Sequence, residues 1–161
     1  MKKLILIVTL IFLVITSSFG QCNFKTVNRP DGNIINYFNP KPVIIQSDYE
    51  VGISIYKNMT TDELMLSISV LFKSMTPKKL TKNLIIQTTN IKGIELKPLV
   101  SETMVMNGRN VSVGMYKIEK ADFFELKKYA LKSLFFYLEG NLKGASVTEN
   151  NTIIKNELNC F

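Results

Sequence analysis

Hydrophobic and polar residues alternate with a period of two through much of this chain, a pattern typical of half-buried β-strands. Segments 50–56 and 64–72 show it most clearly, with apolar residues at every second position and small or polar residues between them. The polar stretch 57–62 that separates them has the length of a hairpin connection. The two segments are therefore predicted to form an antiparallel pair.

Shorter apolar or alternating runs, bounded by turn residues, predict the remaining strands. They lie at 34–38, 84–88, 94–96, 103–106, 110–117, 131–138 and 142–147. Asn107-Gly108 is the strongest hairpin signal, because a type I′ turn needs a positive φ at both central residues. Pro40 and Pro42 are expected to end the strand at 34–38.

Two segments favour helix. Segment 121–129 mixes apolar residues with charges and carries Lys127 and Lys128 at its C-terminal end. A closing helix is expected after Thr148 as its cap, with Ile154 and Leu158 four residues apart on one face. About eight strands and two short helices, one of them C-terminal, predict a mainly β fold. The expected architecture is a single antiparallel β-sandwich-like or half-open barrel domain over residues 21–161.

The first twenty residues have the pattern of an export signal. Lys2 and Lys3 precede an apolar run at 4–15, and small residues at Ser18 and Gly20 predict cleavage after Gly20. As a helix the run spans only about 18 Å, against roughly 30 Å for a hydrocarbon core, so an uncleaved anchor is the lesser alternative. The protein is therefore expected to be periplasmic or secreted, with no transmembrane span after cleavage.

Lipoprotein processing before Cys22 is a second alternative. It requires a small residue before the cysteine, and Gln21 occupies that place. Lipidation would also leave Cys160 as a single thiol in an oxidising compartment. Lipid anchoring through Cys22 is therefore the less favoured form.

The Lys-Lys start, the apolar run and the Ser-Phe-Gly-Gln junction resemble exported proteins of Bacteroidota-type bacteria. The mature part resembles small uncharacterised exported proteins of that group, which end in a short helix and a terminal cysteine. The similarity is one of layout. It implies a location and carries no active residues.

Cys22 and Cys160 are predicted to form a disulfide, because the context is exported and the chain has two cysteines in all. The bridge would close a loop of about 138 residues, worth roughly 5 kcal/mol at most in the chain-entropy model. No C-x-x-C spacing is present, so the predicted bridge is structural rather than redox-active.

Composition narrows the chemistry. The 161 residues include no His and no Trp, which excludes Ser-His-Asp and Cys-His catalysis and His-ligated zinc, and two cysteines exclude a four-Cys metal site. Removal of Lys2 and Lys3 lowers the net charge from +7 to +5. Nucleic acid is not an expected partner, since the protein is predicted to be exported and Arg29 and Arg109 are its only arginines.

Four lysines gather near one predicted loop and are candidates for contact with an anionic surface such as lipopolysaccharide or an acidic glycan: Lys73, Lys78, Lys79 and Lys82. The alternative is that they solvate an exposed loop and protect strand edges.

Aromatic residues concentrate at 123–137, and three methionines surround the Asn-Gly hairpin: Met104, Met106 and Met115. The aromatic segment 131–138 is apolar on both faces. This favours a core strand over a hydrophobic groove that binds a lipid or a peptide. The methionines are expected to pack adaptably against neighbouring side chains. A copper site is not expected, because it would require histidine ligands close to the methionines.

The favoured function is that of an exported, non-catalytic binding or accessory domain of the envelope or the secreted fraction. It would hold an unknown protein or glycan on an exposed sheet face or edge, and an apolar patch too large for a monomer would mark that surface.

One alternative is a carrier whose half-barrel holds a lipid-like ligand in a cavity of several hundred Å³. Another is a hydrolase without histidine, which needs converging carboxylates such as Asp31 with Glu50 or Glu95 with Glu102. No cofactor is expected.

Overall fold

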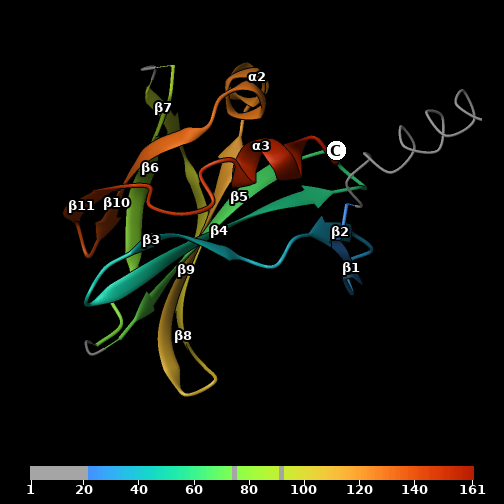
Figure 1. The fold of residues 1–161 in the computed structure, drawn as a ribbon. Helices are drawn as coiled ribbons and strands as arrows, with labels where there is room; N and C mark the ends of the chain where they lie inside the picture. Colours follow the sequence, from blue (N-terminus) through green and yellow to red (C-terminus); the bar gives the residue numbers. More distant parts are fainter. Residues whose placement is uncertain (1–21, 74–75, 91–92) are drawn as a thin grey trace, which may run out of the picture.

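A computed structural model describes residues 22–73, 76–90 and 93–161 (Figure 1). The predicted signal peptide, residues 1–20, lies outside the described residues. The described chain folds into two antiparallel sheets with two short helices, as the alternating pattern predicts.

The first sheet is curled and has seven strands. They are β1 (Lys25–Asn28), β2 (Ile34–Tyr37), β3 (Lys41–Ile45), β4 (Tyr49–Asn58), β5 (Leu64–Phe72), β8 (Pro98–Met106) and β9 (Arg109–Ile118). Their order is β1-β2-β4-β5-β9-β8, and β3 pairs with the half of β4 that β2 leaves free. The predicted pairing of segments 50–56 and 64–72 is confirmed, with Ile53 opposite Ile68.

The second sheet has four strands in the order β11 (Asn141–Ser146), β10 (Leu131–Leu138), β6 (Leu80–Thr88) and β7 (Gly93–Leu96). Lys97 alone separates β7 from β8, so the chain steps directly from one sheet to the other. The predicted Asn107-Gly108 turn has positive φ at both central residues, and the turn at Glu139-Gly140 has the same feature.

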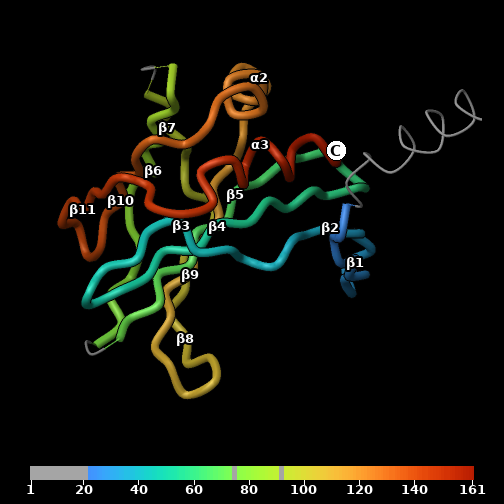
Figure 2. The backbone as a smooth tube through the Cα atoms, viewed as in Figure 1, coloured from blue at the N-terminus to red at the C-terminus, as the bar shows by residue number. Residues whose placement is uncertain are grey.

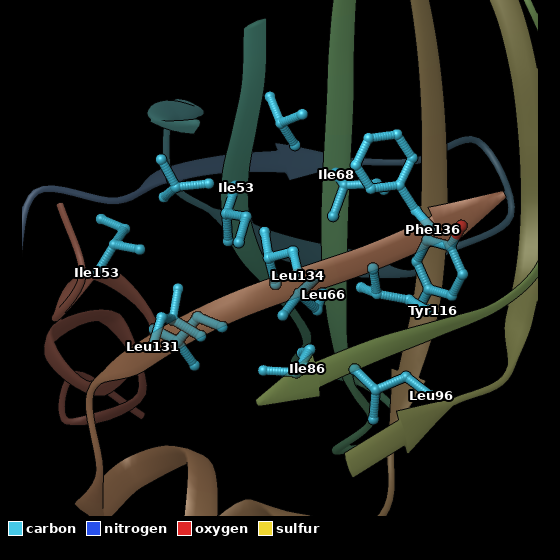
Figure 3. Close-up of a cluster of buried hydrophobic side chains, with 14 of the residues drawn as sticks. Ile53, Leu66, Ile68, Ile86, Leu96, Tyr116, Leu131, Leu134, Phe136 and Ile153 are labelled. Atoms are coloured by element: carbon cyan, nitrogen blue, oxygen red, sulfur yellow. The ribbon is translucent and has the colours of Figure 1, made fainter. Parts of the chain in front are cut away.

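The core lies between the inner faces of the two sheets (Figure 3). Alternate residues of β4 from Val51 to Ile55 and of β5 from Leu66 to Val70 are fully buried there, in one cluster with side chains of β9 and of β6 and β10 from the second sheet. The labelled members are Ile53, Leu66, Ile68, Ile86, Leu96, Tyr116, Leu131, Leu134, Phe136 and Ile153. These side chains fill the interior in which a half-barrel carrier would hold its ligand.

The helices are α2 (Lys120–Lys128) and α3 (Ile153–Leu158). α2 agrees with its prediction to within one residue, and Ile154 and Leu158 are both buried as expected. Thr148 does not cap α3, and that prediction is wrong. The Thr148 N–H instead donates to the Val43 carbonyl at 2.9 Å, and Thr152 takes the cap position.

Two strands were not expected, β1 and β3, and the strands number eleven in the described residues rather than about eight. β1 is exposed along its whole length, so it carries no alternating signal. β3 contains Pro42, which a strand tolerates where no neighbour needs its missing N–H. β3 pairs with β4 on one side only.

The predicted disulfide is confirmed. Cys22 and Cys160 are bonded, with their Cα atoms 5.7 Å apart, and the tube in Figure 2 shows the C-terminal end of the chain beside the start of the described N-terminal segment. Next to the bridge, the rings of Phe24, Phe38 and Phe161 pack together at centroid distances of 5.6–6.0 Å. The two ends are thus joined by a covalent bond and by an aromatic cluster.

Candidate functional site

The outer face of the first sheet carries many apolar side chains over β5, β9 and β8, interrupted by Glu102 opposite Val113 and by two serines of β5. Strand register fixes this arrangement, because residues directly opposite each other point to the same side. Leu71 lies opposite Val111, which lies opposite Met104, and these three form one row. Together the apolar members make up what we call the β8–β9 face: Met65, Leu71, Val100, Met104, Met106, Val111, Val113 and Met115.

Much of this face is open to water at its β8 side. Val100, Met104 and Met106 are 46%, 37% and 51% exposed. Methionine there offers a flexible, polarisable contact surface. The expectation that the methionines near the hairpin serve packing is therefore wrong for Met104 and Met106, while Met115 is half-buried.

The tip of the β8–β9 hairpin extends beyond the body of the protein as an arm (Figure 1). Val105 points to the other side of the arm from Met104 and is 70% exposed, so both sides carry apolar groups in water. β8 contains no lysine; Glu102 is its one charged residue, and its one proline, Pro98, lies at the far end from the tip. Exposed apolar side chains on both sides of a free strand are the usual condition for adding a further strand.

β8 is also the last strand of its sheet, so one side of its backbone has no neighbouring strand. The turn closes on the pair Met106–Arg109, and ladder bonds alternate from that pair along the hairpin. The N–H and C=O groups of Glu102, Met104 and Met106 consequently face β9. Those of Ser101, Thr103 and Val105 face outward.

The four predicted lysines have different surroundings. Lys73 is bound at the first sheet, where its Nζ lies 3.1 Å from Glu50 Oε1 and 2.8 Å from the Gln46 carbonyl. Lys78 is half-buried, Lys79 is exposed, and the Nζ of Lys82 lies 4.8 Å from the centre of the Tyr137 ring on the second sheet. Lys73 is therefore held by an ion pair, whereas Lys82 lies beside an aromatic ring.

The aromatic residues divide as well. Phe136 is fully buried, as expected for a core strand, whereas Phe124 on α2 is 76% exposed. Phe135 and Tyr137 are half-buried and stand outside the core cluster. The expectation that segment 131–138 is a core strand on both faces thus holds for the face of Phe136 and is wrong for the face of Phe135 and Tyr137.

A surface groove of about 830 Å³ lies between the β4–β5 turn, the end of β9, the start of α2 and the C-terminal residue. Leu64, Phe123 and Phe161 supply apolar lining. Its charged lining is largely paired: Lys57 Nζ lies 2.9 Å from Asp62 Oδ1, and Lys117 Nζ lies 3.6 Å from Glu119 Oε1. The groove therefore combines apolar lining with paired charges, a lining of the amphipathic kind that a carrier would need.

Glu157 is a buried acid that the sequence reading passed over. It is 4% exposed, and its Oε2 accepts the Ile55 N–H at 2.8 Å where the neighbour of β4 changes from β2 to β3. Burial raises the pKa of Glu157 to about 7, opposed by the Ile55 N–H and by Lys41. Its position three residues after Ile154, on the apolar side of α3, is the signal that marks it.

Three of the four carboxylates considered for hydrolysis have other partners, and the fourth, Glu102, is exposed on β8. Asp31 pairs with Arg29 in the β1–β2 turn, Glu50 pairs with Lys73, and Glu95 accepts a hydrogen bond from Asn83 at 2.7 Å. Within the described ranges, no group of three or more Cys, Asp or Glu is placed to hold a metal ion. No helix in that part of the chain is long and apolar enough to cross a membrane.

Comparison with protein-family models, with curated proteins and with solved structures gave no match for this chain. The functional argument therefore depends on the geometry described above.

Proposed function

We propose that the protein is an exported, non-catalytic binding or accessory protein that holds a protein partner on the β8–β9 face. The observation that carries this proposal is the apolar arm, which exposes Met104, Val105 and Met106 on both sides of a free edge strand. The partner chemistry that fits is an extended segment with apolar residues at alternate positions. Such a segment would pair with Ser101, Thr103 and Val105 and cover the neighbouring methionines.

Export is part of the proposal. The N-terminal pattern of residues 1–20 supports it, and so does the Cys22–Cys160 disulfide, which is typical of oxidising compartments. A binding role also agrees with the ion-paired or hydrogen-bonded state of Asp31, Glu50 and Glu95.

Photo-crosslinking in the producing cells tests this function. A photo-reactive amino acid at Val105 is expected to give one dominant protein adduct, because this side chain is 70% exposed at the centre of the proposed contact. The matched control is the same group at Phe124, which is 76% exposed on α2. Identical adducts at both positions, or none at Val105, would contradict the proposal.

Met104→Lys should reduce the Val105 adduct at least tenfold, because it places a charge in the contact while leaving the core unchanged. Leu142→Lys, at a 54% exposed position on β11, should leave the yield unchanged. The adduct yields of the variants are compared on a non-reducing gel at equal protein level. Equal yields from the Met104→Lys and unaltered proteins would show that this face is not the contact.

The groove favours one second candidate, a carrier of an amphipathic small ligand at Leu64, Phe123 and Phe161. This alternative predicts an adduct in the native mass spectrum that disappears on denaturation and is lost in Phe123→Ser. A bare mass from gently purified protein would exclude it.

A further inference from the structure

The outer face of the second sheet carries a pair of aromatic rings two residues apart on β10. Leu134, Phe136 and Leu138 are buried, so the alternating Phe135 and Tyr137 point to the opposite, outer side. Phe135 lies opposite Gly144 of β11 and Ile85 of β6, and Tyr137 lies opposite Leu142 and Thr81. Both rings thus stand in the middle of a sheet face, flanked by strands on each side.

Gly144 allows the Phe135 ring to lean across the sheet. A Cβ added at Gly144 would lie 2.7 Å from Phe135 Cε1, a distance that side chains do not tolerate. The ring therefore occupies the space that any other residue would fill. The ring lies against the Gly144 backbone, and the Phe135 side chain as a whole is half-buried.

Lys82 places a cation at the second ring. Its backbone has a φ of 57°, at an irregularity where β6 and β10 shift register between Phe135 and Tyr137. The Nζ atom lies 4.8 Å from the centre of the Tyr137 ring, a cation–π distance. The bend in β6 thus brings an ammonium group beside an aromatic platform.

Polar groups border the rings. In the adjacent row of the face, Ser133 lies opposite both Gln87 and Ser146. Asn83 and Glu95 form a hydrogen bond of 2.7 Å on the side of β6 and β7. A ligand on the rings would therefore meet hydrogen-bond donors and acceptors in the adjacent rows, beside the apolar side chains of Ile85 and Leu142.

The surroundings are positively charged. Lys78, Lys79, Lys82 and Lys132 lie on or beside the second sheet, against the carboxylates of Glu95 and Glu139, whereas Lys143 lies opposite the buried Phe136 and so points to the other side from the rings. Among the ion pairs of the described residues none includes any of the first four lysines. Their excess charge is available to an anionic ligand.

We propose that this face binds an acidic saccharide, with a sugar ring stacked on Phe135 and Tyr137 and a carboxylate contacting Lys82. The electron-rich face of an aromatic ring attracts the C–H bonds of a pyranose, and the rows with Gln87 and Asn83 suit its hydroxyls. The charge excess selects uronates over neutral sugars. The site lies on β6, β10 and β11 and is independent of the partner proposed for β8.

Calorimetric titration of the exported, disulfide-bonded protein tests the proposal, with hexagalacturonate and the neutral cellohexaose as probes. Hexagalacturonate is expected to bind at least tenfold more tightly than cellohexaose. Tyr137→Ala should lower the affinity for hexagalacturonate at least fivefold. Gly144→Val should have the same effect, because it displaces the Phe135 ring. Phe124→Ala, which removes an exposed ring on α2, should bind as the unaltered protein does.

Lys82→Gln separates a specific site from loss of fold. This variant should lower the affinity for hexagalacturonate at least fivefold. Its affinity for cellohexaose and its melting temperature should stay unchanged. Absence of binding to hexagalacturonate, or equal affinities for the two probes, would overturn the proposal, and so would unchanged affinity in Tyr137→Ala and Lys82→Gln. Binding to phosphatidylglycerol vesicles without binding to hexagalacturonate would assign the surface to membranes and would also overturn it.

Discussion

Loss of the Cys22–Cys160 disulfide is expected to lower the free energy of unfolding by about 3–5 kcal/mol. The bond joins residues 138 apart in sequence, so nearly the whole described chain lies inside one loop of the denatured state. Opening that loop increases the entropy of the denatured chain, and the native contacts change little. Urea unfolding of the oxidised protein and of a Cys22→Ser, Cys160→Ser double variant measures the difference.

The aromatic cluster at the same place provides the control. Phe24, Phe38 and Phe161 remain in the double variant and hold the ends near each other in the folded state. Adding a reductant should therefore destabilise the unaltered protein and have no effect on the double variant. If the free energy of unfolding falls by less than about 1 kcal/mol in the double variant, the denatured chain stays compact without the bond.

Stability is expected to fall as the pH rises from about 5 to 8, because of Glu157. Burial raises the pKa of this carboxyl in the folded protein from 4.5 to about 7, and the Ile55 N–H that it accepts opposes the shift only in part. The folded state therefore holds a proton that the unfolded chain has already released above its own pKa. The stability associated with protonated Glu157 is full below pH 4.5 and is lost as the pH rises through 7, by roughly 3 kcal/mol in total.

Glu157→Gln isolates this effect, since an amide oxygen can still accept the Ile55 N–H but cannot ionise. The variant should match the unaltered protein near pH 5 and exceed it in stability at pH 8. Glu139→Gln, at an exposed turn position, should show the same pH dependence as the unaltered protein. Parallel curves for Glu157→Gln and the unaltered protein between pH 5 and 8 would contradict the assignment.

The sequence predicts the central strands well because their two faces differ in chemistry. In β4 and β5 one face is aliphatic and the other is mostly small or polar, so the period of two is plain. β8 has apolar residues on both sides, and local pattern cannot tell which side the body of the protein will cover. That is why Met104 and Met106 were assigned to packing, although the arm carries them into solvent.

The candidate surfaces depend on contacts that no local pattern encodes. Lys82 reaches Tyr137 only because β6 is bent where it pairs with β10. Lys73, nine residues earlier, turns instead to Glu50 on the other sheet. Similarly, Glu157 is buried because α3 lies against β4 at the point between its pairings with β2 and with β3. The disulfide could be predicted because two cysteines allow one pairing.

The most direct test of the binding role is amide hydrogen exchange on β8, resolved by residue with NMR, in the protein alone and with the crosslinked partner added. Free protein should show fast exchange at Ser101, Thr103 and Val105 and slow exchange at Glu102 and Met104, which face β9. Bound partner should slow the first three at least tenfold. If the partner binds and these three amides still exchange as in the free protein, β8 is not the strand that receives it.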